Sequence, residues 1–130
     1  MADSVASQTI SQDGSFALMK FTNISDGTGE SAVVKVDVSA LSPACAQVRI
    51  RRIWYIMYGM AVRILWDATT DVVALLLPAD GCGVLDFRDV RGISNDAGAG
   101  ITGDILFTTV GHTAGDTYSV ILELEKIGKG

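Results

Sequence analysis

The sequence predicts an all-β fold, an antiparallel β-sandwich of jelly-roll-like form or a small barrel, with about eight or nine strands and little helix. Three observations support this class. Apolar residues recur with a period close to two in most segments. Turn-forming residues separate these segments at a spacing of roughly 8–12 residues. No window of about ten residues keeps an apolar stripe of helical period without interruption by glycine or β-branched residues.

The chain of 130 residues is long enough for one domain with its own core. We expect residues 1–14 to form an N-terminal arm or edge strand and residues 15–130 to form a single β-sandwich domain. The net charge of −5, with acids scattered along the chain, argues against a nucleic-acid partner. An apolar fraction of 48% beside only 19% charged residues indicates that some apolar surface is reserved for protein partners.

The N-terminal residues are polar and lack the pattern of a signal peptide, so we expect a cytosolic origin. No apolar run is long enough to cross a bilayer, so we expect no membrane partner. Cys45 and Cys82 are expected to be free, buried thiols, and a Cys45–Cys82 disulfide is the alternative.

Turn formers and alternation place the strands in order along the chain. Residues 31–40 alternate cleanly, with Lys35 on the polar side, and predict a half-solvated strand. Residues 72–77 are apolar on both parities and predict a buried central strand that Pro78 ends. Residues 88–103 form the one long irregular segment. The predicted strands are residues 16–24, 31–40, 47–58, 60–67, 72–77, 84–87, 104–110 and 117–127, the last with Tyr118, Val120, Leu122 and Leu124 facing inward.

Residues 47–67 are the most informative stretch, because they hold both tryptophans and four of the six arginines. The period of two predicts a long β-hairpin that turns at Tyr58 and Gly59, where glycine supplies a positive φ. Apolar residues fall on both parities of its first strand, including Ile53 and Met57. A strand with one solvated face needs apolar residues on one parity alone, so we expect this strand to be covered on both sides, by a second sheet or by another subunit.

No catalytic, cofactor-binding or metal-binding residue is predicted. Gly98 to Gly103 match the pattern G-x-G-x-x-G, but strand-forming residues follow where a dinucleotide site needs a helix N-terminus. His112 is the single histidine, and no nucleophile elbow accompanies it. Six oxygen-bearing side chains of a kind that binds Ca²⁺ match no EF-hand spacing, and acidic turn residues are common for turn reasons alone: Asp80, Asp86, Asp89, Asn95, Asp96 and Asp104.

Several segments together resemble a group of small virion structural proteins of tailed bacteriophages. These segments are residues 66–71, 77–81, 85–87, 95–98, 102–105 and 118–124. The resemblance implies a non-enzymatic structural role, as a capsid decoration or cement protein that stabilises the shell through subunit interfaces. It also implies that the protein is made in the host cytoplasm and located in the virion. A neck or tail component is the nearest variant.

The resemblance and the apolar surplus together predict the partners. We expect a homo-oligomer, with a trimer favoured, that contacts the major capsid protein or other virion proteins and needs no cofactor. Arginine and aromatic residues concentrate at interfaces, so the predicted interface residues are Arg49, Arg51, Arg52, Ile53, Tyr55, Met57 and Arg63. Under this hypothesis the arginines pair with acids of the shell or of sister subunits.

Two alternatives come from other functional classes. Residues 92–105 resemble the uracil-binding hairpin of trimeric dUTPases, which implies a nucleotide-hydrolysing enzyme. The aromatic residue of that hairpin is absent, and so are the other signatures of that family. The second alternative is a lectin-like module that binds a carbohydrate or another ligand.

Overall fold

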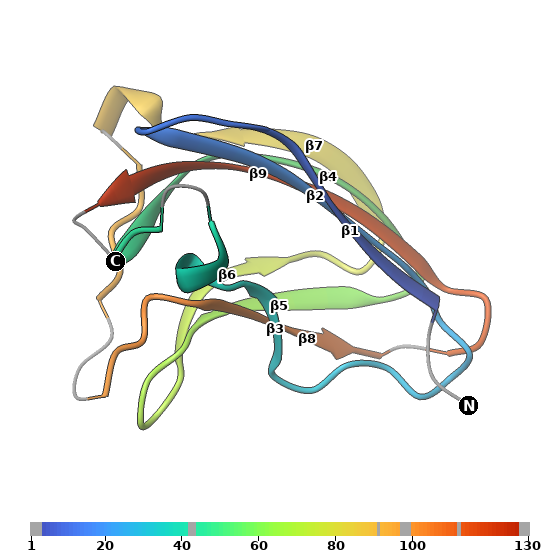
Figure 1. Cartoon of the computed structure of the whole chain (residues 1–130). Coiled ribbons are helices and arrows are strands. Elements are labelled where there is room, and N and C mark those ends of the chain that lie inside the picture. Colours follow the sequence, from blue (N-terminus) through green and yellow to red (C-terminus); the bar gives the residue numbers. More distant parts are fainter. Residues whose placement is uncertain (1–3, 42–43, 91, 97–99, 112, 128–130) are drawn as a thin grey trace.

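The computed structural model describes residues 4–41, 44–90, 92–96, 100–111 and 113–127, and shows two β-sheets packed face to face (Figure 1). Sheet A contains, from edge to edge, β1 (Ser4–Gln12), β2 (Phe16–Ile24), β9 (Thr117–Ile127), β4 (Gln47–Tyr58) and β7 (Gly81–Asp86). Sheet B contains β3 (Val33–Val36), β8 (Ile105–Val110), β5 (Ala61–Trp66) and β6 (Val72–Leu77). Two short 3-10 helices, η1 (Val38–Ala40) and η2 (Arg88–Val90), are the only helical elements of the described residues.

The strand pairing is that of a jelly roll. β2 pairs with β9, β3 with β8, β4 with β7 and β5 with β6, always antiparallel, so the chain is a set of nested hairpins folded across two sheets. The pairs β1–β2, β4–β9 and β5–β8 complete the sheets. The predicted fold class is therefore confirmed. This arrangement joins strands far apart in sequence, which a jelly roll requires.

Strands β2 and β9 follow the expected alternation. The four predicted inward residues of β9, Tyr118, Val120, Leu122 and Leu124, are at most 1% exposed. Opposite them, β2 buries Ala17, Met19 and Phe21. Phe107 of sheet B packs edge-on against Phe21 and Tyr118, at ring-centroid distances of 5.4 and 5.8 Å. These contacts hold the two sheets together, because aromatic rings in this geometry add to the burial of apolar area.

A β-bulge at Arg51 changes which side chains of β4 face the core. The pairing of β4 with β9 shifts between Ile50 and Arg52, so one extra residue lies in β4 at that point. Val48 and Ile50 face inward before the bulge, and Ile53 and Met57 face inward after it, all at most 4% exposed. The prediction that Ile53 and Met57 lie at an interface is therefore wrong. The bulge explains why the inward parity changes between Ile50 and Ile53.

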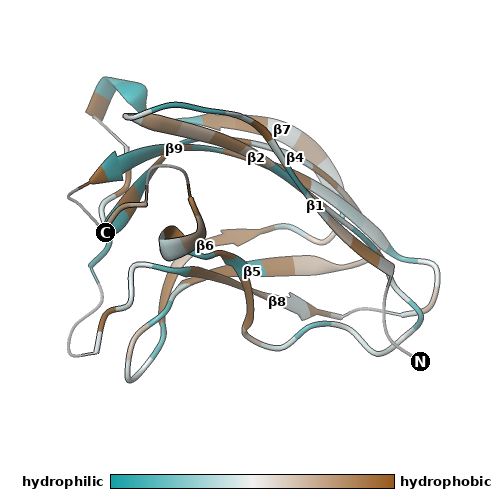
Figure 2. Ribbon diagram, in the orientation of Figure 1, coloured by the Kyte–Doolittle hydropathy of each residue, from teal (hydrophilic) through white to brown (hydrophobic). Residues whose placement is uncertain are grey.

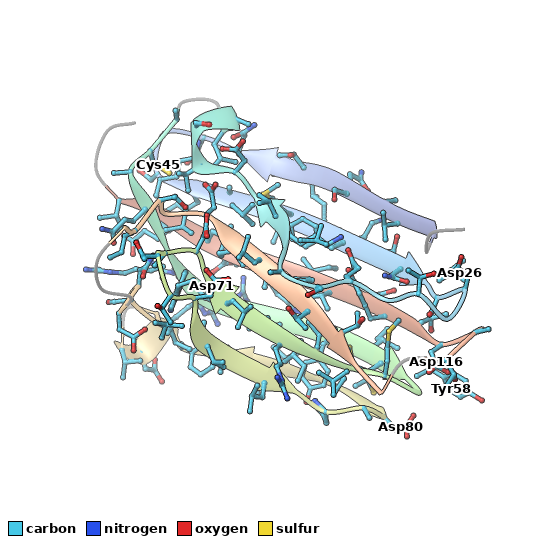
Figure 3. All side chains as sticks on the ribbon, turned by 90° about the horizontal axis from the view of Figure 1, so that it is seen from below. Asp26, Cys45, Tyr58, Asp71, Asp80 and Asp116 are labelled. Atoms are coloured by element: carbon cyan, nitrogen blue, oxygen red, sulfur yellow. The ribbon has the colours of Figure 1, made fainter. Side chains whose placement is uncertain are left out.

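The stretch 47–67 is not a hairpin, because β4 and β5 belong to different sheets. The chain crosses between the sheets at Gly59, which has a φ of +83°. The Gly59 N–H donates to Asp80 Oδ1 at 2.8 Å, and a Cβ at this position would collide with the Asp116 carboxylate. Tyr58, Asp80 and Asp116 gather at this end of the sandwich (Figure 3). Glycine is needed here for both its φ and its lack of a side chain.

Strand β6 lies at the edge of sheet B and not at its centre, which corrects the prediction for residues 72–77. Leu77 is buried in the core, but Leu76 and Val73 are 64% and 46% exposed. The residues of β6 are apolar on both parities (Figure 2). The rest of the chain nevertheless covers only one side of the strand. The described residues include no helix long and apolar enough to cross a membrane.

Candidate functional site

The outer face of sheet A carries a ladder of arginines and glutamates. The bulge turns both Arg51 and Arg52 outward, beside Arg49, and the facing residues of β9 are Glu123 and Glu125. Arg52 Nη2 lies 2.6 Å from Glu123 Oε1, and Arg51 Nη1 lies 3.7 Å from Glu125 Oε1. Arg49 Nη1 is 3.9 Å from the same Glu125 oxygen. Each of these three predicted interface arginines thus lies within 4 Å of a carboxylate of its own chain.

Two arginines of the ladder also cover aromatic rings. The Arg52 guanidinium lies 4.6 Å from the Trp54 ring centroid, and the Arg51 guanidinium lies 5.0 Å from that of Phe16. Partly exposed cation–π contacts of this kind stabilise by about 0.5–1 kcal/mol each. The Arg52 contact restrains the ring of Trp54, which also lines an apolar groove.

A pocket of about 380 Å³ opens beside the ladder. Its lining residues include Phe16 and Leu18 from β2, residues Arg51, Arg88 and Glu123, and residues 11–13 at the end of β1 and the start of the turn that follows. Its cations are already engaged: Arg51 is near Glu123, and Arg88 Nη2 lies 2.7 Å from Asp86 Oδ2. The pocket therefore offers no surplus charge for an ionic ligand.

The same Arg88–Asp86 pair contains the carboxyl group on this face whose pKa departs most from its ordinary value. Hydrogen bonds from the Arg88 side chain and backbone lower the pKa of Asp86 to about 2. Because this folded-state pKa lies below the ordinary value near 3.9, any stabilisation is complete above that value and is lost as the pH falls toward 2. Both side chains are more than 40% exposed, so this pair matters for local charge and little for stability.

An apolar groove of about 270 Å³ lies next to the ladder on the outer face of sheet A. Trp54 and Ile56 of β4 line it together with Val84 of β7 and Ile121 of β9. Ile56 is 64% exposed and Val84 is 55% exposed. No charged residue lines the groove among the described residues. A solvated sheet face is ordinarily polar, so this groove is a candidate contact surface for another protein.

The predicted interface residues separate into three groups. Arg49, Arg51 and Arg52 lie together in the ladder on sheet A. Arg63 is exposed on the other sheet, on the outer face of β5. Tyr55 is half-buried and packs against the core, where Ile53 and Met57 are enclosed. The outward residues Trp54 and Ile56 lie in the groove. They are absent from the predicted interface residues, because the bulge that sets their orientation has no sequence signature.

The two cysteines are free and lie in different environments. Cys45 is buried, and burial raises the pKa of its thiol. Cys82 is exposed and lines the apolar groove, so the prediction of a buried thiol is wrong for it. A reactive probe is expected to reach Cys82 first.

The other motifs lack the surroundings that their chemistry needs. Gly103 is followed by Asp104 and then by strand β8, and not by a helix that would bind a pyrophosphate. Gly98 and His112 lie outside the described residues. Among the residues that are described, no group of three or more histidine, cysteine, aspartate or glutamate side chains is placed to hold a metal ion.

A buried polar cluster that the sequence did not indicate joins the two sheets at one end. Lys35 Nζ lies 2.5 Å from Glu30 Oε2, and both side chains are at most 5% exposed. Glu30 Oε1 accepts hydrogen bonds from Asn23 Nδ2 at 2.9 Å and from Tyr118 Oη at 2.5 Å. A shift in register between Val34 and Val36 turns Lys35 away from the solvent side predicted for it. Each charge has a close partner, which fits a structural role.

Comparisons with known proteins assign the chain to no family. No protein-family model and no curated protein sequence matches it. One solved structure similar to the chain is a cupin superfamily protein from Desulfitobacterium hafniense. It is 13% identical, with 98% of this chain and 81% of that chain covered and a TM-score of 0.36. A likeness this low carries no argument about function.

Proposed function

We propose that the protein is a non-enzymatic structural protein of a bacteriophage particle, a capsid decoration protein that works as a homo-oligomer. The trimer is the favoured form. A position in the neck or tail of the particle would use the same surfaces. The resemblance to small virion proteins supplies the setting, and the outer face of sheet A supplies the physical support.

The observation that carries this proposal is the apolar groove formed by Trp54, Ile56, Val84 and Ile121. Its centre is apolar, and every arginine of the ladder beside it lies within 4 Å of a carboxylate of the same chain. An interface between identical chains needs such a surface, because a patch that meets its own copy must not bring unpaired like charges together. Apolar centres with polar rims are the usual anatomy of protein interfaces.

Strand β1 gives a second, weaker support. It is a nine-residue edge strand, Ser4–Gln12, with no charged residue and no proline. Monomeric proteins usually protect such edges with charges or by covering them. Val5 and Ile10 are 49% and 44% exposed on this strand. An uncharged edge of this kind is suited to pairing with a strand of a neighbour.

Sedimentation of the purified chain tests the groove as the contact between copies. We expect the wild-type chain to sediment as an oligomer and Ile56→Asp to raise the dissociation constant at least about 100-fold, because the new carboxylate would be buried without a partner. Ile56 is exposed, so the fold tolerates the change. The control is Val90→Asp, because Val90 is 70% exposed and lies in η2, outside the groove. Equal oligomerisation of Ile56→Asp and Val90→Asp would remove the groove from the proposal.

A further inference from the structure

The outer face of sheet B is apolar over all four of its strands. Directly opposed residues in antiparallel strands place their side chains on the same face. Because Val62, Ile64 and Trp66 of β5 point into the core, Arg63 and Leu65 point outward. The pairing then defines an outer row that crosses the whole sheet: Val34, Leu106, Leu65 and Val73. A second row contains Thr108, Arg63 and Leu76.

This face is incomplete without a cover. The ends of the outer row, Val34 and Val73, are 49% and 46% exposed, and Leu76 in the next row is 64% exposed, whereas Leu106 inside the row is only 3% exposed. An antiparallel sheet that faces water alternates apolar and polar residues, and here every strand also has an apolar residue in the outward set, beside Thr108 and Arg63. Strand β6 shows this most plainly, since its sequence VVALLL suits burial on two sides.

Arg63 is the one charged side chain in these two rows, and its surroundings set it apart. Of the five arginines that the structure describes, Arg49, Arg51, Arg52 and Arg88 each lie within 4 Å of a carboxylate oxygen of the chain. Arg63 has no such contact among the described residues, and its neighbours across the strands are Thr108 and Leu76. A cover of this face would leave the Arg63 charge buried and unpaired unless the cover brought a carboxylate.

We propose that the outer face of sheet B docks onto a second protein of the particle, whose surface presents aliphatic side chains around one carboxylate that pairs with Arg63. This inference rests on the proposed function and deepens it, because it gives the chain separate faces for its copies and for the shell. Charge complementarity selects this occupant. A guanidinium and a carboxylate within an apolar contact form a strong and specific pair.

A second copy stacked on this face by a two-fold axis is a poor occupant. Such stacking would place two Arg63 guanidinium groups in one apolar interface, and neither outer row contributes an acid. Burial of like charges without partners disfavours the contact. The groove on sheet A has no such obstacle.

Binding of the full-length chain to virus particles tests the proposal. The probe is a particle preparation from virus that lacks the gene for this chain. We expect the wild-type chain to bind these particles saturably and Arg63→Glu to bind at least about 30-fold more weakly. Leu76→Asp, at an exposed position in the same row, is expected to weaken binding similarly. The control is Arg88→Glu, which reverses an exposed arginine outside sheet B and is expected to bind like the wild type.

The outcomes separate this inference from the proposed function. If the wild-type chain binds and both sheet B variants bind equally well, the inference is overturned and the structural role stands. If Arg63→Glu dissociates the oligomer in sedimentation, a second copy occupies this face and the inference is again overturned. A wild-type chain that does not bind the particles overturns the inference and the proposed function together.

Discussion

Replacement of Lys35 by methionine is expected to lower the free energy of unfolding by about 3–5 kcal/mol. The change removes the ammonium group that lies 2.5 Å from Glu30 Oε2 and leaves a carboxylate at a site about 5% exposed. The hydrogen bonds from Asn23 and Tyr118 reach the other oxygen of Glu30 and add no positive charge. Urea denaturation at a fixed protein concentration, followed by tryptophan fluorescence, measures the loss.

The double variant Glu30→Gln with Lys35→Met is the matched control. It removes both charges and is expected to recover at least about half of the lost stability, because an uncompensated buried charge costs more than a missing neutral pair. A loss below about 1 kcal/mol for Lys35→Met would mean that Glu30 has another source of compensation. The assignment of a structural role to this cluster would then be wrong.

Replacement of Gly103 by alanine is expected to destabilise the fold by about 3 kcal/mol or more, the sum of backbone strain and a steric collision. Gly103 has a φ of +90°, which strains any residue with a Cβ. Its added Cβ would collide with the carbonyl oxygen of Ala46 and lie 3.1 Å from Val38 Cγ2. The backbone oxygen cannot move as a flexible side chain would, so the chain between η1 and β4 must shift.

Gly115→Ala isolates the two contributions. Gly115 has a nearly equal φ of +92°, but an added Cβ would meet no atom within 4 Å. We expect this variant to lose about 1–2 kcal/mol, from backbone strain alone. Both variants are compared by thermal and urea unfolding. If Gly103→Ala and Gly115→Ala lose the same stability, the close approach of Ala46 to Gly103 does not exist in solution.

Local sequence patterns predicted much of the fold. Strands β2 and β9 lie where alternation and turn residues placed them, because each strand has one buried face and no irregularity in their mutual pairing. The predictions failed where a strand has a bulge. An extra residue at Arg51 moves Ile53 and Met57 into the core, and the register shift beside Lys35 buries that side chain. A bulge depends on the pairing with another strand, which one segment does not encode.

The same limit applies to the surfaces. The sequence indicated that β4 is rich in arginine and aromatic residues, but not that Glu123 and Glu125, more than seventy positions later, form ion pairs with three of those arginines. It also placed β4 and β5 in one hairpin. Only the crossing at Gly59 separates Arg63 from the ladder and places it on the other sheet, away from those glutamates. Exposed apolar surface was predicted at Ile53 and Met57, which are buried, whereas Ile56 and Leu76 are the exposed ones.

The composition of purified virus particles tests most directly the central claim that other protein chains cover the outer faces of this sandwich. Particles are banded on a density gradient, and this chain and the major shell protein are quantified by mass spectrometry. We expect the chain to remain with the particles at a fixed ratio to the shell protein through repeated banding. Complete absence of the chain from banded particles, with the chain recovered only as a free monomer, would contradict the claim.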